Sequence, residues 1–371
     1  MSPVARAENV GSLLRPAALL EARREVADGS LAPEELRALE DEAVLQAIDL
    51  QGRAGLDVTT DGELRRGAWA QMPEVLTGFE SRETGPGLVW HDAAGEVSAA
   101  AVPRFPTVVG PVRVEGRTSM EDDYAFLAAH ARTRTKFCLA APSYHRRYWS
   151  EQYSKVAYAS CERYLEDVRD AERQIVERLV ALGCDYIQLD APNYGSLCDR
   201  ENRERMTAQG RNLDAELEFD AHLDNSLVAD LSGVTGALHI CRGNGPGGLW
   251  HSSGGYGVIS PALFPDLEFD SLLLEYDTDR AGDFSPLRDV RQGTVVVLGL
   301  LTTKSPALED EQDVERRIRE AASVKPLAEL ALSTQCGFAS VAAGNPLSVA
   351  DEEAKLGLVG RLARKVWGPA S

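Results

Sequence analysis

The sequence lacks three features that would each indicate a class of protein: an excess of positive charge, a long apolar run and a dense set of cysteines. Among 371 residues, 39 Lys and Arg are outnumbered by 58 Asp and Glu, and the formal net charge is −19. This balance argues against a nucleic-acid-binding protein, which needs a basic surface, and against binding to an anionic membrane. No uninterrupted apolar run approaches the ~18 residues that cross a bilayer.

The six cysteines are spread along the whole chain. Scattered cysteines in a chain of this length are more often free thiols or metal ligands than a disulfide framework. The first residues show no basic region followed by an apolar core, so no secretory signal is expected. We therefore expect a cytoplasmic protein, and we expect four of its cysteines to be structural: Cys138, Cys161, Cys184 and Cys198.

Strand-like apolar runs alternate with amphipathic, helix-like stretches. With 44% hydrophobic and 26% charged residues, the composition is that of a globular enzyme with a sizeable core. The expected strands are Glu8–Leu14, Gly55–Asp61, Thr135–Ala141, Asp185–Asp190, Gly236–Cys241, Ser271–Tyr276, Thr294–Leu300 and Leu330–Gln335. Near-continuous hydrophobicity, as at positions 295–298, is typical of parallel strands buried on both faces.

The helix-like segments between these strands include Pro33–Ala54, Tyr153–Leu182, Asn212–Leu231 and Glu309–Ser323. Alternating strands and helices indicate a parallel α/β fold, and eight strands favour a (β/α)8 TIM barrel. We expect residues 1–371 to form one such barrel. The interval 73–133 breaks the pattern with alternating segments such as Gly87–Trp90 and Thr107–Val114. We predict an antiparallel insertion or lid there, after the second strand.

The expected strands end in reactive or hydrogen-bonding side chains. These ends include Ser12, Glu63, Tyr144-His145, Asp190, His239-Ile240-Cys241, Glu275, Lys304 and Cys336. In a TIM barrel the active site is built at the C-terminal ends of the strands. Buried strands in an arbitrary sequence would not all end this way, so these residues are the candidates for a site.

Four of these residues could form one zinc site: His239, Cys241, Glu275 and Cys336. His239 and Cys241 are two residues apart on one strand and therefore point to the same face. Zinc binds thiolate, imidazole and carboxylate ligands in a roughly tetrahedral shell. The spacing alone is weak evidence, because Cys241 and Cys336 could equally be buried small side chains in a core.

The sequence resembles the catalytic, C-terminal half of cobalamin-independent methionine synthase and its shorter stand-alone relatives. The stretches that carry the resemblance span nearly the whole chain in the family's order. They are residues 10–16 (VGSLLRP), 56–63 (LDVTTDGE), 187–192 (IQLDAP), 239–242 (HICR), 274–275 (LE) and 335–337 (QCG). Agreement at this many separated strand ends is specific to the family.

The resemblance implies a (β/α)8 barrel with zinc bound by His239, Cys241, Glu275 and Cys336. It also implies homocysteine as the thiol substrate, with Glu63 and Asp190 at its ammonium and Ser12 at its carboxylate. Carboxylates at the ammonium agree with physical expectation, because an unpaired buried charge is costly. A methyl donor, a methyl-folate or a methyl-corrinoid, would then alkylate the activated sulfur.

The donor half of the site departs from the family pattern. Ala191 stands where the family has a second acidic residue, and Lys304 stands where methionine synthases carry a proton-donating histidine. The aromatic platform for the folate ring is not clear, and Tyr144, His145 and Trp149 are the donor-side candidates. Lys304 could protonate a leaving group or bind an anion, or it could form an ordinary ion pair.

The residues leave several functions open. The leading hypothesis is a zinc-dependent S-methyltransferase acting on homocysteine or a close aminothiol. An alkyltransferase with another thiol or donor, of coenzyme M, epoxide or corrinoid type, is an alternative. A zinc-free barrel resembling uroporphyrinogen decarboxylase and a non-catalytic ligand-binding protein are two further alternatives. Neither the donor nor the oligomeric state follows from the sequence.

Overall fold

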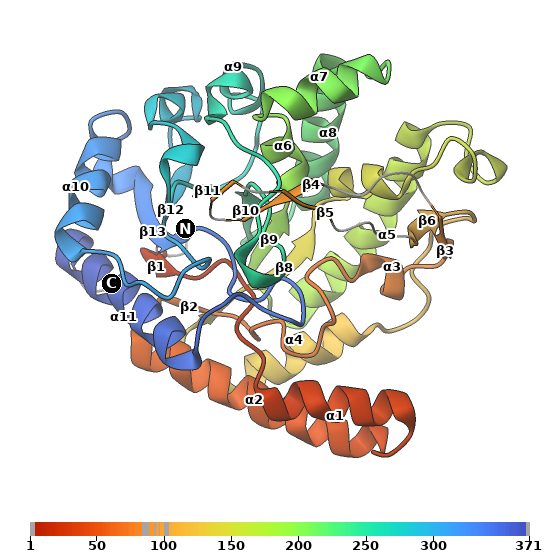
Figure 1. Ribbon diagram of the computed structural model, residues 1–371, viewed down its shortest axis with the longest axis horizontal. Coiled ribbons are helices and arrows are strands. Elements are labelled where there is room, and N and C mark those ends of the chain that lie inside the picture. Colours follow the sequence, from red (N-terminus) through yellow and green to blue (C-terminus); the bar gives the residue numbers. More distant parts are fainter. Residues whose placement is uncertain (1–3, 84–88, 93, 96, 100–103, 369–371) are drawn as a thin grey trace.

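The computed structural model describes residues 4–83, 89–92, 94–95, 97–99 and 104–368, and it shows an α/β fold built on a curled parallel sheet (Figure 1). Seven strands form this sheet in the order β1-β13-β12-β11-β10-β9-β8. Their bounds are β1 Ala7–Glu8, β8 Phe137–Ala140, β9 Tyr186–Asp190, β10 Thr235–Ile240, β11 Ser271–Glu275, β12 Val295–Leu301 and β13 Leu330–Thr334.

A second parallel pair, β2 Val58–Thr59 and β7 Arg134–Thr135, lies beside the edges of the curled sheet. The Asp57 backbone N–H donates to the Ala7 carbonyl (2.8 Å), and the Lys136 N–H donates to the Thr59 carbonyl (3.0 Å). A strand therefore overlaps each of the eight predicted ranges, although β1 shares only Glu8 with the predicted Glu8–Leu14. One predicted strand is divided into β7 and β8 at Lys136, whose buried ammonium donates to Glu8 Oε2 (2.5 Å).

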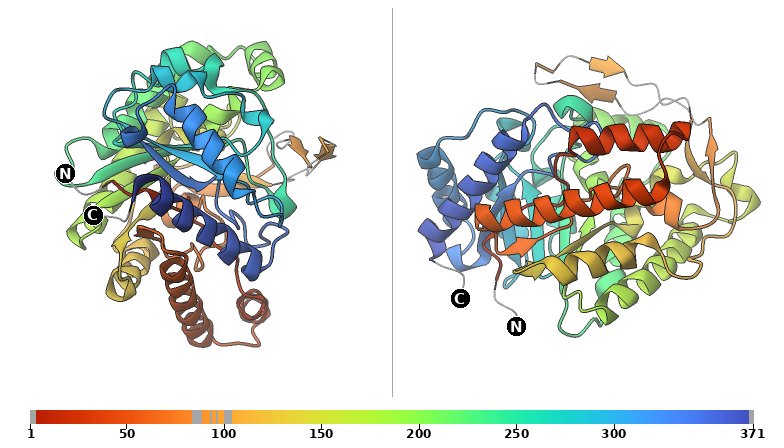
Figure 2. Two further views of the ribbon diagram at one scale, coloured as in Figure 1. Left: turned by 90° about the vertical axis from the view of Figure 1, so that its left-hand side faces the viewer. Right: turned by 90° about the horizontal axis from the view of Figure 1, so that it is seen from below.

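Helices surround the sheet. They are α1 Ala17–Asp28, α2 Pro33–Ala54, α3 Met72–Val75, α4 Ser119–His130, α5 Cys161–Ala181, α6 Pro192–Ser196, α7 Arg200–Ala208, α8 Leu213–Val228, α9 Ser260–Leu263, α10 Glu311–Ala322 and α11 Val349–Trp367. Figure 2 shows α1 and α2 side by side in the view from below. No helix in the described part of the chain combines the length and the apolar character that crossing a membrane requires.

Several predicted helix ends are off by a few residues, because capping side chains set the true ends. The predicted helix starting at Tyr153 begins instead at Cys161, where Ser160 Oγ accepts a hydrogen bond from the Arg163 N–H. Asn212 and Asp310, predicted near helix starts, are the capping residues of α8 and α10. A side-chain oxygen at this position satisfies a backbone N–H that has no partner within the helix.

Side chains along each strand alternate between an outer and an inner face of the sheet. On the outer face, Leu189 and Leu238 join the large apolar cluster that includes residues of the helices. The inner face has a separate, smaller cluster: Val10, Val58, Tyr186, Ala237, Leu273, Val295, Val297 and Ala331. Because side chains two residues apart share a face, Asp190, His239 and Glu275 point inward with this smaller cluster.

The segment between β2 and β7 contains two antiparallel pairs. Strand β3 (Phe79–Arg82) pairs with β6 (Phe105–Val108), and β4 (Val89–His91) pairs with β5 (Val97–Ala99). The predicted range 73–133 also contains α4, which packs on the α2 and α5 helices, and its bounds stay a prediction. Gly87 of the predicted segment Gly87–Trp90 lies outside the described residues. The role of this segment as a lid stays a prediction.

Candidate metal centre

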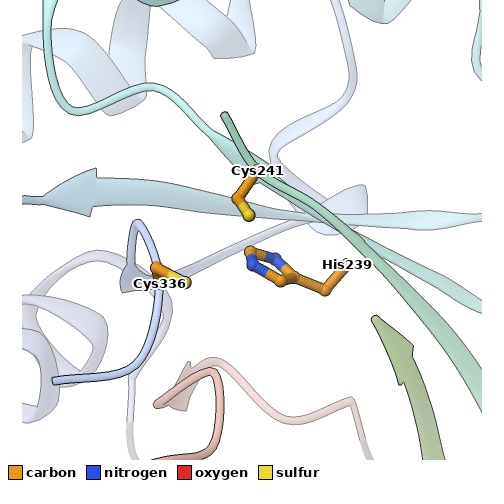
Figure 3. A group of neighbouring side chains, drawn as sticks. All are labelled: His239, Cys241 and Cys336. Atoms are coloured by element: carbon orange, nitrogen blue, oxygen red, sulfur yellow. The ribbon is translucent and has the colours of Figure 1, made fainter. Parts of the chain in front are cut away.

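Three of the four predicted ligands converge on one point. One ligand atom each from His239, Cys241 and Cys336 lies within 4.8 Å of the other two, and all three residues are buried. Figure 3 shows the two sulfur atoms and the imidazole ring directed toward one another. His239 and Cys241 come from the end of β10, whereas Cys336 follows β13, so the chain brings distant segments together here.

The local backbone explains how Cys241 is held. A Cβ placed on Gly195 of α6 would lie 1.8 Å from the Cys241 carbonyl oxygen. Only glycine therefore allows α6 to pack this closely against the end of β10. The position of Cys241 depends on a neighbouring element as well as on its own strand.

The donor set fits zinc. His239 Nδ1 lies 3.2 Å from the Leu273 carbonyl oxygen, while its buried Nε2 has no hydrogen-bond partner. A histidine that donates from one ring nitrogen to a carbonyl leaves the other free to bind a metal. Two thiols and an imidazole are ligands that zinc prefers.

The two thiols are coupled to each other. A hydrogen bond from Cys241 lowers the pKa of Cys336 well below its usual value, and His239 adds to this effect. The same hydrogen bond, together with burial, raises the pKa of Cys241. Burial alone would lower the pKa of His239, but the neighbouring Cys336 raises it. The other two groups thus favour the thiolate form of Cys336.

Glu275, the fourth predicted ligand, lies beside this cluster but outside it. Its Oε1 accepts a hydrogen bond from Arg280 Nη2 (2.5 Å), and its Oε2 accepts one from the Arg242 backbone N–H (2.8 Å). The carboxylate is fully buried, and its pKa is lowered because the cations of Lys304, Arg280 and Arg242 outweigh the effect of burial.

The predicted ammonium site is a pair of buried carboxyl groups. Burial, with the nearby Asp190 and Asp61, raises the pKa of Glu63 to about 7, although Arg66 and Arg15 act against the shift. Burial raises the pKa of Asp190 to about 6, opposed by His239 and by a hydrogen bond from Gln188 (2.7 Å). Glu63 Oε2 has no hydrogen-bond partner.

Ser12 lies beside the loop that carries Cys336. The Phe338 N–H donates to the Ser12 carbonyl (2.8 Å), and the Ala339 N–H lies 3.4 Å from Ser12 Oγ. A Cβ on Gly337 would lie 2.0 Å from Ser12 Oγ. The close approach of these two loops therefore requires glycine at 337, and it places Ser12 next to the candidate metal ligands.

Comparison with known proteins agrees with this geometry. The family model described as "Cobalamin-independent synthase, Catalytic domain" matches residues 6–347. The chain belongs to the cobalamin-independent methionine synthase family. It is therefore an enzyme of the methyltransferase class.

Named relatives cover most of the chain. The protein YxjH of Bacillus subtilis, whose activity is uncharacterised, is 36% identical over 98% of this chain and 94% of its own length. The methionine synthase of Saccharolobus solfataricus is 30% identical over 89% of this chain and 86% of its own length. A crystal structure of a putative vitamin-B12-independent methionine synthase from Listeria monocytogenes has a TM-score of 0.74, 27% identity and 99% coverage of both chains.

In this member of the family, Lys304 lies near the candidate metal centre. Its Nζ donates to the Gly243 carbonyl (3.0 Å) and to Asn244 Oδ1 (2.9 Å), and its charge helps to lower the pKa of Cys336 and Glu275. Within the described residues it forms no ion pair. The ordinary ion pair considered from the sequence is therefore not its contact in this structure.

The three donor-side candidates point in different directions. They lie on or after the 3₁₀ helix η1 (Pro142–Tyr148), in which residues three apart share a side. Tyr144 packs on Trp69, with ring centroids 4.6 Å apart, and Cys241 contributes to the raised pKa of this buried tyrosine. His145 does not share this side, since its Nε2 lies 3.0 Å from Glu172 Oε1 on α5.

Trp149 has contacts outside the cluster. Its Nε1 donates to Glu151 Oε1 (2.7 Å), and its ring stacks near Tyr164 with centroids 6.2 Å apart. A donor-side role for Tyr144, His145 and Trp149 stays a prediction. Sequence adjacency at a strand end did not show which side of the 3₁₀ turn each residue occupies.

Sequence reasoning did not single out Arg147, which lies next to Tyr144. Arg147 shares a side with Tyr144, and its guanidinium lies 4.4 Å from the Phe105 ring centroid and 5.0 Å from that of Tyr144. Trp250, in the glycine-rich loop after Cys241, exchanges two backbone hydrogen bonds with His91 of β4. Nothing in the local sequence indicates this contact between the loop and β4.

Proposed function

We propose that this enzyme transfers a methyl group to the sulfur of homocysteine or of a close aminothiol. The observation that carries the proposal is the position of the His239–Cys241–Cys336 cluster beside two buried carboxyl groups, Glu63 and Asp190. His239, Cys241 and Cys336, with Glu275 as a fourth ligand, would hold zinc. Bound zinc would supply a Lewis acid that keeps the substrate sulfur deprotonated at neutral pH.

The two carboxyl groups support an aminothiol over a simple thiol. Two adjacent buried acids repel each other when ionised, and here Asp190 raises the pKa of Glu63. An ammonium group between them would stabilise both carboxylates and compensate their burial. Ser12 and the backbone N–H groups after Cys336 would receive the substrate carboxylate.

Lys304 and Tyr144 would form the donor side. Lys304 is held by two oxygen acceptors, neither of them charged. Its ammonium could therefore give a proton to the leaving group of the donor or bind an anionic part of it.

We also propose that β2 and β7 join the seven-stranded sheet to close an eight-stranded barrel, because backbone hydrogen bonds connect them on both sides. A cytoplasmic location stays a prediction.

Metal analysis of the purified protein tests the proposal. We expect about one equivalent of zinc per chain and consumption of homocysteine thiol in the presence of a methyl donor. The substrate screen pairs homocysteine or coenzyme M with methyl-folate, methylcobalamin and an epoxide. Zinc below about half an equivalent, not restored by reconstitution, would contradict the proposed metal site. Turnover of coenzyme M without homocysteine turnover would instead favour the alternative alkyltransferase.

A further inference from the structure

Glu275 is held away from the metal ligands by two defined contacts. Its Oε1 receives Arg280 Nη2 at 2.5 Å and its Oε2 receives the Arg242 N–H at 2.8 Å. Arg242 cannot easily move, because its guanidinium donates to the Gly254 and Glu275 carbonyls and lies 4.1 Å from the Tyr256 ring centroid. Of the two contacts, the Arg280 side chain is the one that can be exchanged.

A second acceptor for Arg280 lies close by. Arg280 Nη2 is 3.7 Å from Asp277 Oδ1, and the Asp277 side chain is fully buried. Neither Asp277 oxygen has a well-formed hydrogen bond, although Thr302 lies near enough to oppose the rise that burial causes in the pKa of this carboxyl, and Arg280 Nε has no hydrogen-bond partner. A buried carboxylate without a hydrogen bond is costly, so Asp277 is a ready second partner for the guanidinium.

The Arg280 guanidinium packs on an aromatic ring, and both carboxylates lie within its reach. Arg280 lies 5.0 Å from the Trp250 ring centroid, and only 13% of its side chain is exposed. It belongs to the short 3₁₀ helix η5 (Asp279–Ala281), just after β11. A side chain stacked on an aromatic ring can slide across it while keeping the cation–π contact.

We propose that Arg280 is a positioning residue that exchanges between Glu275 and Asp277 and so decides whether Glu275 is a metal ligand. This inference rests on the proposed function, because it requires a metal at His239, Cys241 and Cys336. With Arg280 on Asp277, the Glu275 carboxylate is free to complete the ligand set. When a substrate thiolate adds a negative charge to the site, Glu275 would leave the metal and accept hydrogen bonds from Arg280 and the Arg242 N–H.

Charge balance gives the physical reason for the exchange. Two thiolates and a carboxylate already exceed the charge of a divalent ion, and a substrate thiolate would add a further negative charge in a buried site. If Glu275 moves from the metal to the Arg280 cation, the metal loses one carboxylate ligand. The buried Glu275 carboxylate then still has a positively charged partner. In the arrangement seen here, with Glu275 on Arg280, a bound metal would keep one ligand position for the substrate.

The experiment measures metal affinity and coordination in Arg280→Gln and Asp277→Asn. Zinc affinity is measured by competition with a chromogenic chelator. The ligand set is followed by the visible spectrum of the cobalt-substituted protein, with and without homocysteine. Arg280→Gln should bind zinc about tenfold more tightly, and Asp277→Asn about tenfold more weakly, since residues that hold a metal ligand change affinity by about 10- to 100-fold. Homocysteine should alter the cobalt spectrum less in Arg280→Gln than in the wild type.

Arg288→Gln is the matched control. Arg288 is an exposed arginine in the neighbouring 3₁₀ helix η6 (Ser285–Asp289), where its Nε donates to the Ser285 carbonyl (2.8 Å). Its zinc affinity should stay at the wild-type value. Arg280→Lys, which keeps the charge, should restore most of the wild-type affinity and shows that the effect comes from the cation and not from misfolding.

The outcomes separate this inference from the proposed function. If the wild type takes up neither zinc nor cobalt, both proposals are wrong. If the wild type binds cobalt and Arg280→Gln and Asp277→Asn bind it as the wild type does, only the Arg280 exchange is wrong. Equal weakening in both variants would also overturn the exchange, because opposite shifts are its distinguishing result.

Discussion

At the scale of single residues, the thiols of Cys241 and Cys336 are the groups on which the candidate site depends most. Cys336→Ser and Cys241→Ser should each abolish stoichiometric zinc binding and thiol methylation together, because serine replaces a soft thiolate ligand by a neutral hydroxyl. Metal content and initial rates are measured on the same preparation. Cys161→Ser, at a cysteine in α5 outside the cluster, is the control and should keep both properties. Full activity in a zinc-depleted Cys336→Ser would contradict the mechanism.

The carboxyl group of Glu63 should make aminothiol binding depend on pH. Because burial raises its pKa to about 7, the group is partly protonated below that pH and cannot then pair with an ammonium. Homocysteine should bind more tightly as the pH rises from about 6 to about 8, measured by calorimetry.

The Glu63→Gln substitution should weaken the binding of homocysteine by about ten- to hundredfold, the value of a charge-assisted hydrogen bond. It should have little effect on 4-mercaptobutyrate, a thiol without the ammonium. Equal losses for both thiols would exclude Glu63 as the ammonium partner.

At the scale of elements, the packing of α6 against the end of β10 holds a predicted ligand in place. Gly195→Ala should move α6 or the Cys241 backbone, since the added Cβ would meet the Cys241 carbonyl at 1.8 Å. We expect a loss of about 1–3 kcal/mol in the free energy of unfolding and weaker zinc binding, measured by urea denaturation and chelator competition. Gly257→Ala, where a Cβ meets nothing within 4 Å, is the matched control. Unchanged zinc affinity in Gly195→Ala would show that α6 does not position Cys241.

Strand and helix patterns in the sequence predicted the elements well but not their orientation at the site. A strand overlaps each of the eight expected ranges, and most agree closely, because runs buried on both faces are apolar throughout and are easily recognised. The first range is the exception, since β1 shares only Glu8 with it. Helix ends such as the Ser160 cap were misplaced, because a cap depends on one side chain and not on a periodic pattern. The contacts of His145 and Trp149 were not foreseen, because neighbouring residues in and after a 3₁₀ helix point to different sides of it.

At the scale of the whole molecule, several buried acids should make the metal-free protein less stable as the pH rises. Burial raises the pKa of Glu352 to about 8, of Asp224 to about 7 and of Asp220 to about 6. A raised pKa means that the folded state binds more protons than the unfolded state between the two pKa values. Stability therefore falls as the pH rises through that interval, from about pH 4 to about pH 8.

Urea denaturation in the presence of EDTA measures this fall at about pH 5.5 and about pH 7.5. The chelator removes the separate effect of metal loss at low pH. In Glu352→Gln the fall should be smaller, by an amount on the order of 1 kcal/mol or more, since a shift of one pKa unit corresponds to about 1.4 kcal/mol. Glu353→Gln, at a neighbouring and exposed position, is the control. Stability that rises over this interval would contradict the protonation of these buried acids.

The sequence by itself determined the family, the order of strands and helices, and the residue types available for a metal and an ammonium group. These follow from periodic burial and from motifs that are local in the chain. Only the tertiary structure decided which of those residues meet. The structure brings His239, Cys241 and Cys336 together, pairs Glu275 with Arg280, and turns His145 toward α5. The physical reason is that the meeting of Cys336 with His239 and Cys241, and of His145 with α5, joins segments that are separate in the sequence, and only packing sets these distances.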